Sequence, residues 1–174
     1  MNYEVIDNFL TDDQWKSLND LLFFPNGDSK LEFKYVADVN VSSQKNQFAF
    51  GRVVMDQWKT TFDGSDQYID SIMVAVCKRL QKGIKVYRAK VNLFTRTAKN
   101  EGLGMHCDLN TPDYQTIIYY INDNNGGTRF ADGTFVPQKK NRAVIVHGPV
   151  LHESVTQTDT NVRVNININY YERD

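Results

Sequence analysis

The stretch Gly102-Leu-Gly-Met-His-Cys-Asp108 opens the part of this sequence that determines its fold and its chemistry. Three further segments belong with it: Tyr119-Tyr-Ile-Asn-Asp-Asn-Asn-Gly-Gly-Thr-Arg129, Val150-Leu-His-Glu-Ser154 and Asn161-Val-Arg-Val-Asn165. Turn residues separate these segments, so each belongs to a different element of the chain. We therefore interpret the rest of the sequence as a scaffold that brings them together.

A His-x-Asp pair, His106 and Asp108, is the first part of a candidate metal site. In an extended segment this spacing puts both side chains on the same side and turns Cys107 the other way, so we do not count Cys107 as a ligand. His152 lies far along the chain and must come from another strand. Two imidazoles and one carboxylate on one face of a coordination sphere are the facial triad of non-haem Fe(II) sites.

The position of Arg163 indicates which of two histidines, His147 or His152, is the better candidate ligand. A lone histidine is more often a hydrogen-bonded structural residue than a ligand, so the combination carries the argument. Arg163 follows His152 by eleven residues, whereas His147 has no arginine at that distance. We therefore expect His152, and not His147, to complete the site.

In the last expected strand, residues 162–170 form two faces of opposite character. One face carries valine, isoleucine and tyrosine and can pack on helices, and the other carries Arg163, Asn165, Asn167 and Asn169. A polar strand face is usually exposed to solvent, but asparagine is depleted in strands. Three asparagines in register indicate a polar interior, such as a pocket.

Two helices are expected in the first half of the chain. Thr11 and Gln14 form a capping-box pattern at the start of the first helix. The second is expected over residues 65–82, with Ser65 as its cap and Gly83 as its stop. Both have apolar residues at the spacing of one helical face, so both should cover a core.

Strands dominate the rest of the chain, and their expected ranges are 3–6, 31–37, 50–56, 85–94, 115–122, 134–136, 143–146 and 161–171. Helices followed by many short strands predict an α+β chain with a mainly antiparallel sandwich or barrel. The polar segment from Asp38 to Gln47 is expected to be a surface loop, either a connector or a substrate-contacting lid.

Composition limits the possible classes of protein. A chain of 174 residues is most simply one domain, and its net charge of −1 argues against nucleic acid or an anionic membrane as partner. The sequence contains no apolar run of membrane-spanning length and no secretory signal. Cys77 and Cys107 lie in unrelated contexts, which argues against a disulfide framework and for a reducing, cytoplasmic location.

These motifs resemble those of Fe(II)- and 2-oxoglutarate-dependent dioxygenases, most closely the branch of prolyl 4-hydroxylase catalytic domains and their small bacterial and viral relatives. The motifs that carry the resemblance are His106-Cys-Asp108, Tyr120-Ile-Asn122, Gly126-Gly-Thr-Arg-Phe130, Pro137, Val150-Leu-His152 and Arg163. It covers residues 85–171, and residues 3–11 are similar to the start of the family as well. Two positions differ from the pattern of this family. Asn161 stands where the family often has glycine, and Arg163 stands where many prolyl hydroxylases have lysine.

The resemblance implies a single domain over residues 1–174. Its N-terminal helical part would cover about residues 1–84 and its jelly-roll core about residues 85–171. The core would be a double-stranded β-helix, with the N-terminal helices packed on one sheet and the metal at one mouth.

The resemblance also implies the roles of the main site residues. Fe(II) would be held by His106, Asp108 and His152. The cosubstrate 2-oxoglutarate would chelate the iron, and Arg163 would hold its far carboxylate. A planar guanidinium matches a carboxylate with two hydrogen bonds and stays charged in a closed pocket.

Further cosubstrate contacts are implied for residues on three strands. Related oxygenases have Asn-x-Tyr where this chain has Asn92 and Phe94, so Asn92 is a candidate although the tyrosine hydroxyl is missing. Asn165 on the polar strand face is another. Tyr119 or Tyr120 could supply a phenol; alternation puts only one of them in the pocket, and ordinary packing is the alternative for either.

The implied activity is hydroxylation of an unactivated C–H bond, in which 2-oxoglutarate and O2 are converted to succinate and CO2. A peptidyl proline is the first substrate candidate, and free amino acids, other small molecules and nucleobases are alternatives. The competing functions are a metal-binding jelly-roll module without activity and a Zn(II) hydrolase. Neither of these needs a carboxylate clamp inside the barrel.

Overall fold

The computed structural model describes residues 2–37, 48–60 and 65–173. Its elements are β1 (Tyr3–Ile6), α1 (Asp12–Leu22), β2 (Lys34–Val36), β3 (Ala49–Asp56), β4 (Lys59–Thr60), the 3₁₀ helix η1 (Ser65–Tyr68), α2 (Asp70–Leu80), β5 (Ile84–Thr95), β6 (Tyr114–Tyr120), β7 (Gly127–Phe130), β8 (Phe135–Pro137), β9 (Arg142–His147), β10 (His152–Val155) and β11 (Val162–Glu172). The loop expected from Asp38 to Gln47 lies outside the described residues. Within them, no helix has the length and apolar character needed to cross a membrane.

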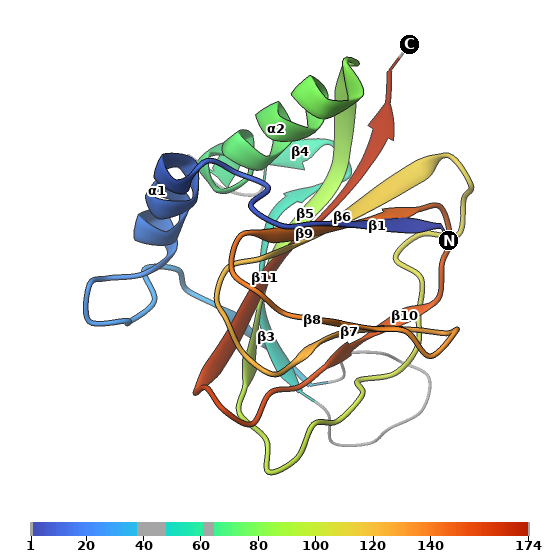
Figure 1. Cartoon of the computed structure of the whole chain (residues 1–174). Coiled ribbons are helices and arrows are strands. Elements are labelled where there is room, and N and C mark those ends of the chain that lie inside the picture. Colours follow the sequence, from blue (N-terminus) through green and yellow to red (C-terminus); the bar gives the residue numbers. More distant parts are fainter. Residues whose placement is uncertain (1, 38–47, 61–64, 174) are drawn as a thin grey trace.

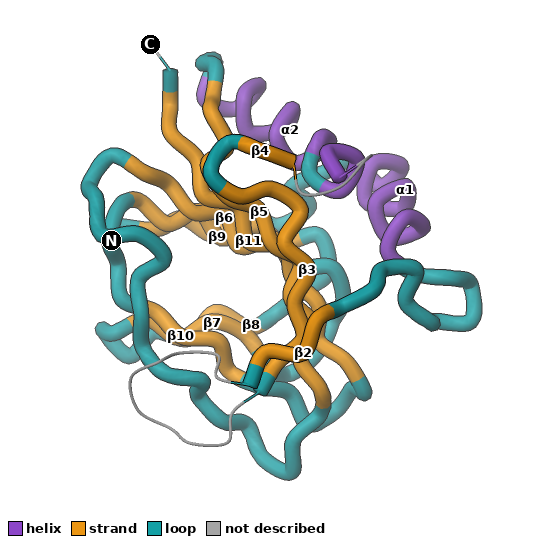
Figure 2. Tube along the Cα trace, turned by 180° about the vertical axis from the view of Figure 1, so that it is seen from behind, coloured by secondary structure: helices purple, strands orange, loops and turns teal. Residues whose placement is uncertain are grey.

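Two antiparallel sheets form the body of the described chain (Figure 1). The larger has the strand order β1-β9-β6-β11-β5-β3-β2, with β4 paired to β3, and the smaller has the order β10-β7-β8. The segment before β6 extends the smaller sheet, because Gly102 pairs with Val155 and His106 pairs with His152. Figure 2, from the opposite side, also shows the smaller sheet facing the larger one.

From β5 onward the chain passes back and forth between the sheets. β5, β6, β9 and β11 belong to the larger sheet, and the segment 102–106, β7, β8 and β10 belong to the smaller one. This connectivity is that of a jelly roll. The first 84 residues are not only helical, since β1, β2 and β3 join the same larger sheet.

The main hydrophobic cluster combines helices and sheet. Leu18 and Leu22 of α1 and Ile72 and Val76 of α2 belong to it together with residues of one face of the larger sheet such as Ile166. In Figures 1 and 2 both helices lie on the side of the larger sheet away from the smaller one. Full burial of each such aliphatic side chain contributes roughly 1.5–3 kcal/mol, so this outer face of the sheet is the main source of stability.

The predicted cap of the first helix is confirmed: Thr11 accepts a hydrogen bond from the Gln14 backbone, and the Gln14 side chain accepts one from the Thr11 backbone. The predicted ends of the second helix are wrong. Ser65 begins η1 and does not cap α2, because this 3₁₀ turn carries the following residues into the core before the α-helix starts. α2 ends two residues early, with Gln81 in place of Gly83 in the left-handed conformation (φ 54°).

Asn141 ties the N-terminal segment to the larger sheet. Its Oδ1 accepts hydrogen bonds from the Leu10 backbone N–H and from the Tyr119 phenol, both at 2.9 Å, and its Nδ2 donates to the Leu10 carbonyl at 2.8 Å. The side chain is buried, and its φ of 59° lies in the left-handed region, which asparagine tolerates better than most residues.

We expect Asn141→Ala to lower the free energy of unfolding by roughly 2–4 kcal/mol, because it leaves both backbone groups of Leu10 buried without partners. Tyr119→Phe removes only one of these hydrogen bonds and should cost about 1 kcal/mol. Urea denaturation followed by circular dichroism measures both. Equal losses in the two variants would contradict this account of Asn141.

Candidate metal centre

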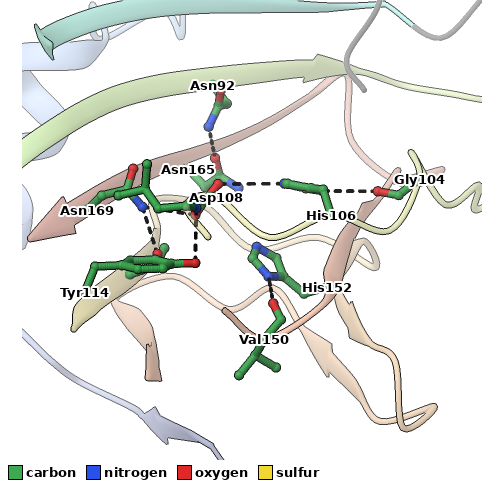
Figure 3. A network of polar contacts seen from close by, with 11 residues as sticks. Asn92, Gly104, His106, Asp108, Tyr114, Val150, His152, Asn165 and Asn169 are labelled. Atoms are coloured by element: carbon green, nitrogen blue, oxygen red, sulfur yellow. Dashed lines mark hydrogen bonds and ion pairs between the residues drawn. The ribbon is translucent and has the colours of Figure 1, made fainter. Parts of the chain in front are cut away.

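His106 and His152 face each other across the bridge that joins the segment before β6 to β10. The backbone N–H of each donates to the carbonyl of the other at 2.9 Å, and their ring centres lie 4.8 Å apart. Directly opposed residues of an antiparallel pair direct their side chains to the same face. The bridge therefore brings two histidines that are distant in sequence to one point (Figure 3).

Each imidazole uses one nitrogen to fix its orientation. Nδ1 of His106 lies 3.1 Å from the Gly104 carbonyl, and Nδ1 of His152 lies 2.9 Å from the Val150 carbonyl. A carbonyl only accepts, so each Nδ1 carries the proton and each Nε2 is free to bind a metal. Burial lowers the pKa of His152, which favours the neutral ring, and its Nε2 has no hydrogen-bond partner among the described residues.

Asp108 completes the cluster. One ligand atom from each of His106, Asp108 and His152 lies within 4.8 Å of the others, and the closest histidine nitrogen, Nε2 of His106, is 3.8 Å from Oδ1 of Asp108. Asn169 of β11 donates from Nδ2 to the other carboxylate oxygen at 3.2 Å. This contact orients the carboxylate, and a metal ligand is usually oriented by such a partner.

Cys107 was not expected to be a metal ligand, and within the described residues it is not part of the cluster of ligand atoms. The residue borders the same cavity as His106 and Asp108, at a point where the chain bends.

Glu153 holds the metal-binding segment against β10. One carboxylate oxygen accepts the Gly104 backbone N–H at 3.1 Å, and the other accepts Nη1 of Arg129 at 2.8 Å. Gly102 lies against the same carboxylate, since a Cβ there would come within 2.3 Å of it. Our sequence interpretation missed Glu153, and its position next to His152 was the available signal.

Arg163 is fully buried in the interior, on the face of β11 that carries the asparagines. Its Nη2 donates to the Gly127 carbonyl at 3.0 Å, whereas Nε and Nη1 have no hydrogen-bond partner among the described residues. The guanidinium lies 4.8 Å from the centre of the Phe94 ring. Burial lowers the pKa of Arg163 to about 10, so the group is charged at neutral pH and costly unless an anion joins it.

Tyr119 and Tyr120 lie on opposite faces of β6. Tyr119 belongs to the cluster beneath the helices and donates to Asn141. Tyr120 belongs to the interior, donates to Thr128 at 2.7 Å and has its ring centre 5.9 Å from the Arg163 guanidinium carbon. Of the two tyrosines that alternation left open, only Tyr120 lies on the Arg163 side.

A cavity of about 290 Å³ borders the metal cluster, and it is lined by Arg88, Lys90, Asn92, Phe94, His106, Cys107, Asp108, Ser154, Asn167 and Asn169. Asn92 lines it directly, and Asn165 supports Asn92 by accepting a hydrogen bond from its Nδ2 at 3.0 Å. Arg88 and Lys90 were not among the predicted site residues. The signal was present, because they share one face of β5 with Asn92.

No protein-family model matches the sequence, and the comparison with curated proteins found no match. The comparison with solved structures, in contrast, found similar proteins. The chain is similar to an oxidoreductase of the 2OG-Fe(II) oxygenase family from Burkholderia pseudomallei, with a TM-score of 0.71, 11% identity, and coverage of 98% of this chain and 85% of that one.

Two further similar structures have more specific descriptions. One is the epimerase SnoN in complex with Fe3+, alpha ketoglutarate and nogalamycin RO (TM-score 0.66, 11% identity, 98% of this chain and 78% of that one). The other is a Pseudomonas putida prolyl-4-hydroxylase (TM-score 0.60, 17% identity, 99% of this chain and 93% of that one). These likenesses confirm that the chain has the fold of the 2-oxoglutarate oxygenases.

We expect the protein to bind one Co(II) ion, used here as a spectroscopic probe, at His106, Asp108 and His152. His152→Ala should weaken that binding by at least about 100-fold, since loss of a mere supporting residue already costs 10–100-fold at such sites. Titration followed by the visible absorption of Co(II) measures the affinity. The matched control is His147→Ala, which removes a histidine outside the cluster; similar losses in both variants would refute the assignment.

Proposed function

We propose that this protein is an Fe(II)- and 2-oxoglutarate-dependent dioxygenase that hydroxylates an unactivated C–H bond of a peptide or small molecule. The observation that carries the proposal is that one jelly roll contains a His-Asp-His cluster and a fully buried guanidinium, which the described residues pair only in part. The cluster alone would suit several metals and reactions. The buried guanidinium adds the requirement for a carboxylate.

The donor set fits Fe(II). His106 and His152 offer neutral Nε2 atoms, and Asp108 offers a carboxylate, from one side of the site. Two histidines and one carboxylate in this arrangement leave further coordination positions for a chelating cosubstrate and for O2. When bound, these groups supply the oxidising chemistry that hydroxylation needs.

The interior fits 2-oxoglutarate. Nε and Nη1 of Arg163 are free to donate to its far carboxylate, and the pair of Tyr120 and Thr128 lies on the same side. Asn92 and Asn165 are the proposed contacts between this clamp and the metal. Phe94 has no hydroxyl to offer, but its ring covers the guanidinium and helps to keep water from it.

The protein's own residues would act by binding and orientation. Asn169 holds the Asp108 carboxylate, and the carbonyls of Gly104 and Val150 hold the two imidazoles. These contacts exist before any ligand is added, so the site is preorganised and little rearrangement is needed at the moment of reaction.

A peptidyl proline is our first candidate for the substrate, because the sequence motifs are closest to the prolyl 4-hydroxylase branch. The similar structures include a prolyl-4-hydroxylase and an enzyme whose complex holds nogalamycin RO, so a small molecule is the alternative. The net charge of −1 gives no reason to propose a nucleic acid.

We expect Arg163→Met to weaken 2-oxoglutarate binding by about 100-fold or more, because the cosubstrate carboxylate would lose its buried partner. The measurement is an anaerobic titration of the Fe(II)-loaded protein, followed by the visible charge-transfer band of the chelate. Arg79→Met is the control, since Arg79 pairs with Glu4 on the surface. Co(II) affinity should not change in either variant. An unaltered 2-oxoglutarate affinity in Arg163→Met would remove the cosubstrate assignment.

We also expect the Fe(II)-loaded protein to form succinate slowly from 2-oxoglutarate and O2 without substrate, and faster with one. Succinate release across peptide, amino-acid and nucleotide panels measures this and identifies the substrate class. His152→Ala should abolish it, and His147→Ala should not. If the correctly loaded protein binds 2-oxoglutarate but never forms succinate with any panel, the binding module becomes the better explanation.

A further inference from the structure

Two basic side chains outside the assigned site face the cavity next to the metal cluster. Arg88 and Lys90 alternate with core residues on β5, and both line the cavity together with His106 and Asp108. In the register between β5 and β11, Arg88 lies opposite Asn169 and Lys90 lies opposite Asn167. Because Asn169 contacts Asp108, these two cations stand at the metal end of the cavity.

Neither cation is paired within the described part of the chain, where Arg88 and Lys90 make no ion pair and no side-chain hydrogen bond. Lys90 is largely withdrawn from solvent, and this burial, followed by the repulsion of Arg88, lowers the pKa of Lys90. Gly51 of the neighbouring strand makes room for it, because a Cβ at Gly51 would lie 2.4 Å from Cε of Lys90. An exposed lysine needs no such space, so the fold provides a specific place for the Lys90 side chain.

Among the described residues that line the cavity, positive charge exceeds negative charge. Among the described residues that line it, Asp108 is the only acidic one, against Arg88 and Lys90. A divalent metal and the 2-oxoglutarate dianion would cancel each other, and Arg163 adds a third cation behind Phe94. Uncompensated cations in a partly desolvated cavity are unfavourable and favour an anionic guest.

We infer that Lys90 and Arg88 bind an oxyanion, a carboxylate or a phosphate, on the substrate that is hydroxylated. This inference rests on the proposed function and adds the substrate class to it. Asn167 lies opposite Lys90 and lines the same cavity, and the Nδ2 group of an asparagine in that place can donate to the same oxyanion. The inference favours an acidic substrate over a neutral prolyl peptide.

The two cations serve a different anion from the one assigned to Arg163. Arg163 and Asn169 are six residues apart on β11, so their backbone positions are separated by about 20 Å. Arg163 stands at one end of the polar strand face, and Arg88 and Lys90 stand at the other, beside Asp108. One short diacid held by Arg163 cannot also occupy the substrate side of the metal.

The test measures three probes with one carbon chain and different end groups: 6-fluorohexanoate, 6-fluorohexyl phosphate and 6-fluorohexanamide. Their binding is followed by ¹⁹F NMR on protein loaded with Zn(II) and saturating 2-oxoglutarate, and again on metal-free protein. We expect at least one acid to bind at least tenfold more tightly than the amide. Lys90→Met and Arg88→Gln should each reduce this preference about tenfold or more, while the surface control Lys78→Met keeps it.

Five results would overturn the inference. Two concern the probes themselves: an amide that binds as well as both acids, or no binding by any probe. Two concern the variants: an acid preference that survives in Lys90→Met and Arg88→Gln, or a preference that Arg163→Met removes but these variants do not. The fifth is a loss of 2-oxoglutarate affinity in Lys90→Met as large as in Arg163→Met, because it would place the cations on the cosubstrate. Preference between the two acids separates carboxylate from phosphate.

Failure of the proposed function can be distinguished from failure of the inference. If the protein shows no 2-oxoglutarate binding and no succinate formation, the proposed function fails, and the metal-free titration still decides whether Lys90 and Arg88 form an anion site. If succinate forms but the acids show no preference, only the inference fails.

Discussion

The metal cluster depends on one piece of backbone pairing, the two hydrogen bonds between His106 and His152. The segment that carries His106 and Asp108 belongs to no regular strand, and its backbone pairs with β10 through this bridge and the one between Gly102 and Val155. Glu153 strengthens the junction from its own side of β10 by holding Gly104. A short, locally pinned segment can therefore present two ligands rigidly while the chain on either side turns toward the larger sheet.

The polar interior is possible because the stability of the fold is obtained elsewhere. The outer face of the larger sheet packs against both helices and contains the main apolar cluster. The inner face of β11 then carries Arg163, Asn165, Asn167 and Asn169. Buried polar groups and charges add little to stability unless they are fully paired. Their concentration on the inner face of this strand is a property of a binding site more than of a core.

Much of this arrangement could be predicted from the sequence where a regular period operates. The two faces of β11, the polar side of β5 and the capping box at Thr11 follow from local spacing, and the structure has all of them. The pairing of His106 with His152 could not be derived from spacing, since it joins residues far apart. The motif resemblance implied only that both histidines are ligands of one metal.

The sequence could not decide whether Tyr119 or Tyr120 faces the pocket, and the structure shows the physical reason. Both are fully buried tyrosines on one strand, and the sequence around them is apolar on both sides. Only the partners differ, Asn141 beneath the helices and Thr128 in the interior, and they lie 22 and 8 residues further along the chain, outside the strand itself. Burial raises the pKa of both phenols, so each must donate its proton to an acceptor. Which face becomes the pocket is therefore decided by the placement of acceptors and charges around the strand, and hydrophobicity alone carries no information about it.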